Sequence, residues 1–157
     1  MTHPPPPNKA RVGKLIRAAK RLAKQYRRET GRPLGVTGEV AEYEAARLLG
    51  CELAPVRQAG YDVFRRKGGK IDKLQVKGRC VPPGNRSQRL GSIRLTHKWD
   101  GVLLVLLNED LEPMEIYEAR RPALAKAILR PGSKARNERG ALTVSLFKAI
   151  GKQRWRR

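Results

Sequence analysis

Apolar residues recur every three or four positions between residues 10 and 28, and this spacing predicts an amphipathic helix. Its apolar face consists of Val12, Leu15, Ile16, Ala19, Leu22, Ala23 and Tyr26. The other faces carry seven basic residues, namely Lys14, Arg17, Lys20, Arg21, Lys24, Arg27 and Arg28. We expect the apolar face to lie on the rest of the protein, so that the basic faces point outward.

A second helix is predicted to follow the Gly31-Arg32-Pro33 break. Thr37 can cap it, Gly50 ends it, and its buried stripe is Val40, Ala41, Ala45, Leu48 and Leu49. Three short strands are predicted next, at about 53–57, 61–65 and 71–77. The last two are separated by a Gly68-Gly69 pair that is typical of a hairpin turn.

The run Val102-Leu103-Leu104-Val105-Leu106-Leu107 is apolar at every position, which predicts a central strand covered on both faces. A basic loop at 82–92 precedes it. A strand at 113–119, a helix at 121–129 that begins near Pro122, a loop to residue 140 and a helix at 142–150 are predicted after it. This order of elements favours an α/β fold in which helices flank a mixed β-sheet.

The chain of 157 residues is long enough for one domain with a real core. We divide it into a Pro-rich lead at 1–9 that is expected to be disordered, a basic amphipathic helix at 10–32, an α/β core at 33–129 and a basic C-terminal extension at 130–157. Its longest apolar run is far shorter than the roughly 20 residues of a membrane-spanning helix. The opening residues lack the layout of a secretory signal, so we expect a cytoplasmic protein without a membrane partner.

The formal net charge of +21 indicates a polyanion as the partner. The charge is uneven: residues 9–32 carry +9, residues 130–157 carry +8, and the middle keeps twelve of the fourteen acids. A basic ribosome-like peptide would be cationic throughout. Two cationic arms around a segment that contains carboxylates instead suggest a protein that binds nucleic acid and in which Asp or Glu side chains have a functional role.

The two cysteines, Cys51 and Cys80, form neither a disulfide framework nor a zinc pattern, and we expect ordinary reduced thiols. The two histidines, His3 and His97, are scattered, so a bound metal would need oxygen ligands.

Hydrolysis of a phosphodiester calls for a divalent cation held by such ligands, with a lysine nearby. Strand alternation places Gln75 and Lys77 on one face, opposite Leu74 and Val76. Asp62 lies across the expected hairpin, where a carboxylate between apolar neighbours is costly unless it is paired or metal-bound.

Two segments resemble the PD-(D/E)XK nuclease superfamily in their position and residue types. They are Gly60-Tyr61-Asp62-Val63 and Leu74-Gln75-Val76-Lys77-Gly78. The Gln-x-Lys form resembles the branch that contains Mrr-type restriction endonucleases. The resemblance covers about residues 36–118 and implies a restriction-endonuclease-like fold with an additional basic N-terminal helix. It also implies a Mg²⁺- or Mn²⁺-dependent endodeoxyribonuclease of restriction, repair, junction-resolving or mobile-element type.

By that resemblance, Asp62, the Gln75 side-chain oxygen and the Val76 carbonyl would bind the metal, and Lys77 would act on water. Glu39, in Gly38-Glu39-Val40-Ala41, is the preferred helix acid ahead of Glu42 and Glu44. Each residue has a structural alternative: Glu39 as a first-turn acid favoured by the helix dipole, Asp62 as a turn residue, and Gln75 and Lys77 as the exposed face of an edge strand. Asp72 is a rival carboxylate that alternation points away from Gln75, and Asp100 beside Trp99 can simply begin a strand.

Duplex or branched DNA is the expected partner, and cutting of both strands would favour a homodimer. The expected nucleic-acid contacts are Lys14, Arg17, Arg21, Lys24, Arg28, Arg79, Arg86, Arg89, Arg154, Trp155 and Arg156. Trp155 can stack on a base or pack on the core. Two other functions stay open at this point: a catalytically inactive DNA-binding protein on the same fold, and a basic RNA-binding protein in which Gln-x-Lys is coincidental.

Overall fold

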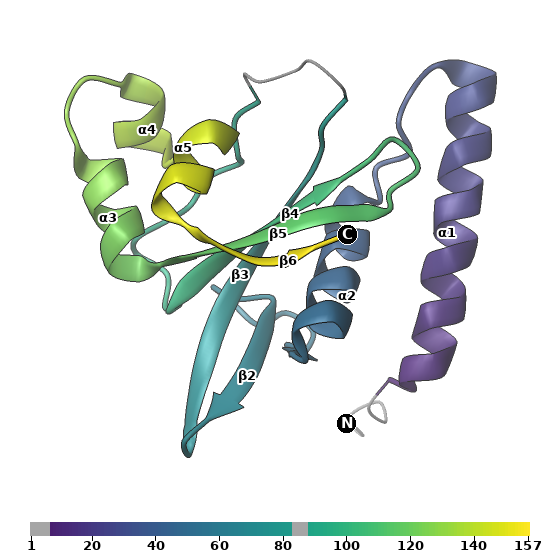
Figure 1. Ribbon diagram of the computed structural model, residues 1–157, viewed down its shortest axis with the longest axis horizontal. Helices are drawn as coiled ribbons and strands as arrows, with labels where there is room; N and C mark the ends of the chain where they lie inside the picture. Colours follow the sequence, from purple (N-terminus) through teal and green to yellow (C-terminus); the bar gives the residue numbers. More distant parts are fainter. Residues whose placement is uncertain (1–6, 83–87) are drawn as a thin grey trace.

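The computed structural model describes residues 7–82 and 88–157. Within them the chain forms a mixed α/β fold built on one six-stranded sheet (Figure 1). The elements are α1 (Lys9–Thr30), α2 (Thr37–Leu49), β1 (Glu52–Leu53), β2 (Val63–Lys67), β3 (Lys70–Cys80), β4 (Gly101–Leu107), β5 (Pro113–Arg120), α3 (Arg121–Leu129), α4 (Lys134–Arg139), α5 (Val144–Ile150) and β6 (Lys152–Arg156).

The strands lie in the sheet in the same order as in the sequence. Neighbouring strands are antiparallel except for β3 and β4, which run parallel and pair Gln75 with Val102 and Lys77 with Leu104. A parallel pair needs a long connection, and residues 81–100 supply it. The predicted mixed sheet flanked by helices, with an additional N-terminal helix, is confirmed.

Helices cover both faces of the sheet, so the protein has three layers (Figure 1). On one face, α2 packs its Val40, Ala41 and Ala45 against alternate residues of β3 and β4. On the other face, α3 and α5 cover the remaining residues of β4 and contribute side chains such as Leu124 and Phe147. Every residue of β4 is buried, as the unbroken apolar run predicted.

The hairpin between β2 and β3 turns at Gly68 and Gly69, as predicted. Both glycines have positive φ, at 55° and 79°, which a two-residue type I′ turn requires. Gly78 of β3 serves a different purpose, because a Cβ there would lie 2.5 Å from the Ala41 Cβ of α2. The missing side chain lets α2 lie directly against β3.

Several predicted boundaries are wrong. The strand expected at 53–57 is limited to Glu52–Leu53, because Pro55 lacks an N–H for the ladder and Arg57 adopts a positive φ of 64°. The strand expected at 61–65 begins at Val63 and runs to Lys67. Thr37 is the first residue of α2 and not its cap, since Val36 occupies the N-cap without a side-chain hydrogen bond.

Residues 130–157 form α4, α5 and β6. A loop was expected where α4 lies, a helix was expected at 142–150, and no strand was predicted where β6 lies. Leu142 and Phe147 are fully buried, and β6 pairs with β5 as an edge of the sheet. Residues 1–6 of the Pro-rich lead, which was expected to be disordered, lie outside the described residues, and Lys9 at its end is already the first residue of α1.

α1 lies beyond α2 at the side of the molecule (Figure 1), but it is docked differently from the prediction. Only part of the apolar face is buried: Ala23 is 7% exposed, whereas Leu15 is 69% and Leu22 57% exposed. The buried side of α1 instead includes Lys20, whose amine lies 2.8 Å from Glu44 and 3.2 Å from Glu112. Among the described residues, no helix is long and apolar enough to cross a membrane.

Candidate functional site

Asp62 lies directly before β2, at the point where β3 continues beyond its pairing with β2. The ladder between the two strands starts at Val63 and Leu74, so the next N–H of β3 on that edge has no strand partner. The Asp62 carboxylate takes this place, since its Oδ2 accepts a hydrogen bond of 2.8 Å from the Val76 N–H. The carboxylate is therefore fixed against the middle of β3.

Gln75 and Lys77 lie on the opposite face of β3 from α2. Leu74 and Val76 belong to the core cluster beneath α2, and side chains alternate along a strand, so the predicted pairing of Gln75 with Lys77 on one face agrees with the packing. The Gln75 side chain is buried, and its Oε1 has no hydrogen-bond partner among the described residues. A buried oxygen without a donor is costly unless another group approaches it.

The Lys77 amine is half-buried near the Asp62 carboxylate. Burial lowers the pKa of Lys77, and the positive charges of Arg79 and Arg94 act in the same direction, whereas the Asp62 charge opposes them. A lysine whose pKa is lowered gives up its proton more readily than an exposed one. Arg94 was not among the residues predicted from the sequence, and its position in an irregular connection gave no signal that could have found it.

The three acids of α2 occupy different environments. Glu39 is exposed in the first turn, and Glu44 is buried in the ion pair with Lys20. Burial raises the pKa of Glu42 to about 7, with further contributions from the charges of Asp62 and Glu39. Glu42 is therefore the helix acid whose environment is most perturbed near Asp62, although the sequence favoured Glu39.

The groups around Asp62 offer oxygen donors to a divalent cation. Among residues 7–82 and 88–157, no group of three or more His, Cys, Asp or Glu side chains could hold a metal ion. The available donors are one fixed carboxylate, the unpartnered Gln75 amide oxygen and backbone carbonyls. Oxygen donors of this kind fit a hard cation such as Mg²⁺, which needs only one or two carboxylates when it keeps several waters.

Rival carboxylates of the sheet have other partners. Asp72 lies on the α2 face, as alternation predicted. Although burial alone would raise its pKa, hydrogen bonds from Arg120 and Arg65 hold the pKa of Asp72 below its usual range. Asp100 accepts a hydrogen bond of 2.8 Å from the Lys73 N–H and so joins the start of β4 to β3.

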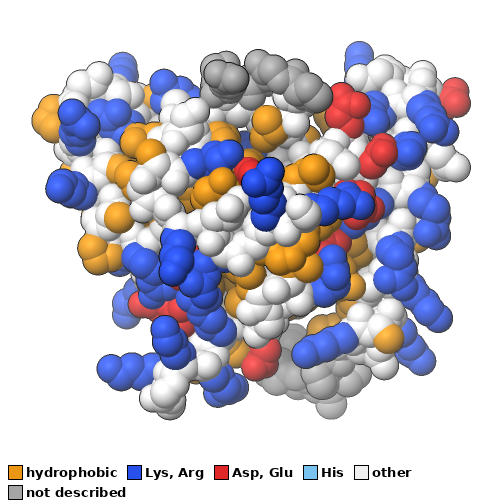
Figure 2. Space-filling model, in the orientation of Figure 1, with side chains coloured by type: hydrophobic (Ala, Val, Ile, Leu, Met, Phe, Trp, Pro, Cys, Tyr) orange, Lys and Arg blue, Asp and Glu red, His pale blue; other side chains and the backbone are white. Residues whose placement is uncertain are grey.

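The basic residues of α1 divide into free and paired side chains. Lys14, Arg17, Arg21 and Arg28 are exposed, and blue side chains line α1 along the right of Figure 2. Lys24 is paired with Asp110 at 3.1 Å, and Arg27 donates to the Glu109 carbonyl at 2.5 Å. The paired residues fasten the C-terminal half of α1 to the turn between β4 and β5.

The other expected nucleic-acid contacts are spread over the sheet and its loops. Arg79 donates to the Arg89 carbonyl at 3.1 Å, while Arg89 is exposed and Arg86 lies outside the described residues. In β6, Arg156 is exposed and Arg154 lies 3.5 Å from Glu118. Trp155 is half-buried against the core cluster beneath α2, in agreement with the packing alternative for this residue.

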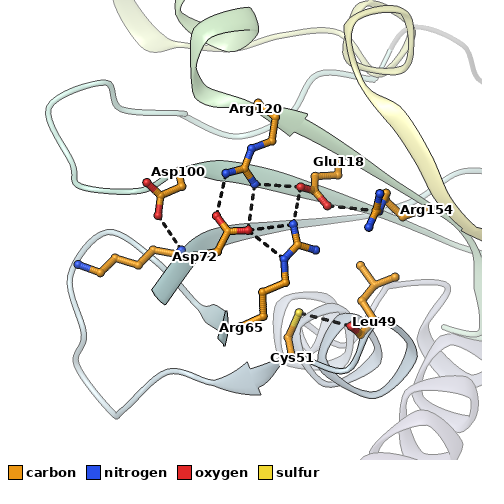
Figure 3. Close-up of polar contacts among 9 residues, drawn as sticks. Leu49, Cys51, Arg65, Asp72, Asp100, Glu118, Arg120 and Arg154 are labelled. Carbon is orange, nitrogen blue, oxygen red and sulfur yellow. Dashed lines mark hydrogen bonds and ion pairs between the residues drawn. The ribbon is translucent and has the colours of Figure 1, made fainter. Parts of the chain in front are cut away.

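A network of arginines and carboxylates on the α2 face was missed by the sequence analysis. Arg65 of β2 and Arg120 of β5 share the carboxylates of Asp72 and Glu118, with Arg154 of β6 at the edge (Figure 3). The five residues come from four strands, and the contacts that join the β2–β3 hairpin to β5 link residues 53 apart for Arg65 and Glu118 and 48 apart for Asp72 and Arg120. No local spacing could therefore have revealed the network.

No family model matches the chain, and no curated protein does. Among solved structures, the chain is similar to the bacterial homing endonuclease I-Ssp6803I, with 23% sequence identity and a TM-score of 0.40. The match covers 54% of this chain and 63% of the homing endonuclease.

Proposed function

We propose that the protein is a DNA-binding endonuclease that hydrolyses phosphodiester bonds and depends on Mg²⁺ or Mn²⁺. The observation that carries the proposal is the arrangement on β3. A carboxylate fixed at Val76 lies near a lysine with a lowered pKa, on a strand that also carries a buried amide oxygen without a partner. These groups match the Asp and Gln-x-Lys residues that resemble the PD-(D/E)XK superfamily.

Asp62, Gln75 and the Val76 carbonyl would hold the cation. When bound, the cation would supply charge for the developing phosphorane and lower the pKa of water. The Val76 N–H keeps one oxygen of Asp62 engaged and leaves the other free. The Gln75 oxygen gains the partner that it lacks among the described residues.

Lys77 would act on the water or on the scissile phosphate. Because its pKa is lowered, a larger fraction of its amine is neutral than in an ordinary lysine, and only the neutral Nζ can accept a proton from water. In its protonated form, the same amine would stabilise the charge that develops on the phosphate oxygens. Glu42, with Glu39 beside it, would orient water from α2, because its raised pKa lets it gain or lose a proton near pH 7.

Incubation with supercoiled, linear and branched DNA in Mg²⁺ or Mn²⁺ tests this function. Asp62→Asn and Lys77→Met are expected to lower the cleavage rate at least about a hundredfold while leaving most of the binding intact. Lys73→Met is the matched control, because Lys73 lies on the same face of β3 but outside the proposed centre. Preference for one substrate would identify the type of endonuclease, and concerted cutting of both strands would indicate a homodimer.

A catalytically inactive DNA-binding protein is the second candidate. Gln75 places a neutral amide where a carboxylate would hold a cation more strongly, and the described residues contain no group of three His, Cys, Asp or Glu side chains that could hold a metal ion. If the unaltered protein does not cleave DNA even at high concentration, the result favours this candidate over the nuclease. A higher affinity for structured RNA than for duplex DNA at matched salt would favour an RNA-binding protein instead.

A further inference from the structure

A cavity of about 650 Å³ opens on the α2 face of the sheet, on the opposite side from Gln75 and Lys77. The arginine–carboxylate network forms its floor, and the hairpin between β2 and β3 forms one wall (Figure 3). In Figure 2, Lys and Arg side chains gather over the lower left of the view, where Figure 1 places this hairpin. The proposed catalytic centre uses none of these side chains.

The cavity is cationic. Its lining contains six basic side chains, from Arg65, Arg66, Lys67, Lys70, Arg120 and Arg154, against the three carboxylates of Asp72, Asp100 and Glu118. The carboxylates already have partners, because Asp72 and Glu118 accept from arginines and Asp100 accepts from a backbone N–H. An anion that enters therefore meets a surplus of positive charge.

The arginines of the floor still have N–H groups to donate, although Arg65 is held firmly and Arg154 loosely. Arg65 donates to Asp72 at 2.9 Å and to Glu118 at 2.7 Å, which holds its guanidinium rigid. Among the described residues, Arg65 Nη1 and both Nη atoms of Arg154 have no hydrogen-bond partner. Arg154 Nε lies 3.5 Å from Glu118 Oε2, which itself accepts no hydrogen bond. Arg154 is thus held loosely enough to turn toward a ligand.

We propose that this cavity binds backbone phosphates of a nucleic acid, as a contact surface separate from the catalytic centre. Fixed guanidiniums with free N–H groups are suited to phosphate oxygens. Among residues 7–82 and 88–157, no aromatic side chain that could stack on a base lines the cavity, so it would recognise the backbone and not the sequence. Lys67 and Lys70 at the hairpin extend the cationic surface outward. A nucleic-acid strand with successive phosphates would contact such an extended surface, whereas a single free phosphate would not need it.

The cavity variants remove charge without touching the core. Lys67→Gln/Lys70→Gln changes two exposed residues at the hairpin tip, and Arg154→Gln is a second, independent variant. The matched control is Lys126→Gln/Arg139→Gln, which removes two exposed charges from α3 and α4. Affinity for one duplex is measured over a series of salt concentrations. The double cavity variant is expected to lower the slope of log affinity against log salt by about 1.8, at about 0.9 for each lost phosphate contact.

Nuclear magnetic resonance of the arginine Nε–H groups gives a direct second measurement. The signals of Arg65, Arg120 and Arg154 are followed during titration of the full chain with the duplex, and separately with inorganic phosphate and a mononucleotide. Shifts with the duplex at lower concentrations than with the small phosphates support the proposal. Equal or stronger response to inorganic phosphate would overturn the nucleic-acid assignment and indicate a small-anion site.

The proposal is also overturned if the cavity and control variants change the salt slope equally, or if the duplex leaves all three arginine signals unmoved. These results do not depend on cleavage. A protein that fails to cut DNA but shows the cavity effect would refute only the catalytic function, and a nuclease without the cavity effect would refute only this contact surface.

Discussion

Lys20 of α1 and Glu44 of α2 form an ion pair of 2.8 Å in which the two side chains are only 9% and 3% exposed. Glu44 also accepts hydrogen bonds of 2.9 Å and 2.6 Å from Arg47, so its carboxylate is well satisfied despite its burial. The pair joins the two helices where a purely apolar contact was expected. The basic N-terminal helix is therefore attached through one of its own cations.

Lys20→Ala is expected to destabilise the protein by up to about 3 kcal/mol, because it leaves the buried Glu44 carboxylate with only the half-exposed Arg47 as a counter-charge. Urea unfolding measures the change. Lys14→Ala on the exposed side of the same helix is the control and should change stability by less than about 0.5 kcal/mol. Equal effects of the two variants would mean that the buried pair does not hold α1.

Glu42 should make stability fall as pH rises in protein without divalent cations. Its pKa is raised from 4.5 to about 7 in the folded protein, so between these values the folded state holds a proton that the unfolded state has lost. This contribution is fully present below pH 4.5 and is lost as pH approaches 7. Glu42→Gln should remove that part of the fall, as urea midpoints across this range would show.

The control for this experiment is Glu29→Gln, an exposed acid of α1 that is not among the charges that raise the pKa of Glu42. It should leave the shape of the pH curve almost unchanged. Parallel curves for the unaltered protein and Glu42→Gln would show that Glu42 titrates at the same pH in the folded and unfolded states.

Exposed arginines of α1 should account for part of the salt dependence of DNA binding. Arg17→Gln/Arg21→Gln is expected to lower the slope of log affinity against log salt by about 1.8 if each arginine contacts one phosphate. The control is Lys126→Gln/Arg139→Gln, which removes equal charge from exposed residues of α3 and α4. A larger effect from the control would exclude α1 as the main contact.

Trp155 should matter for stability more than for binding. Its ring is half-buried against the core, so Trp155→Ala is expected to cost about 2 kcal/mol of unfolding free energy, less than a fully buried tryptophan would. Affinity for single-stranded DNA should change less than twofold. A large loss of affinity with unchanged urea unfolding would show instead that the ring stacks on bases.

The fold was predictable wherever one local pattern dominated. The apolar run of β4 and the helix Arg121–Leu129 lie where the sequence placed them, because burial on both faces and a proline at the first turn leave clear signals. β6 was missed because its residues are nearly all polar. It becomes a strand by pairing with β5, and that partner is more than thirty residues away.

The candidate site was predictable on β3 and less so on α2. Strand alternation has a period of two residues, so Gln75 and Lys77 had to share a face once the strand existed. The choice between Glu39 and Glu42 depends on how α2 is rotated against the sheet. That rotation is set by contacts such as Gly78 against Ala41, which no pattern within the helix reveals.

Gln75→Glu tests whether a divalent cation binds beside the buried side chain of residue 75. A carboxylate at this position would lie buried near the Asp62 charge, so the variant should be less stable than the unaltered protein when divalent cations are absent. Mg²⁺ or Mn²⁺ should restore that stability, because a cation binds a carboxylate more strongly than an amide and stabilises only the folded state. Thermal unfolding with and without each cation measures both effects.

Asp62→Asn/Gln75→Glu should lose most of the cation response, since one of the two carboxylates is then missing. A variant whose unfolding temperature does not respond to either cation would argue that Gln75 faces no metal, and would favour the binding protein over the nuclease.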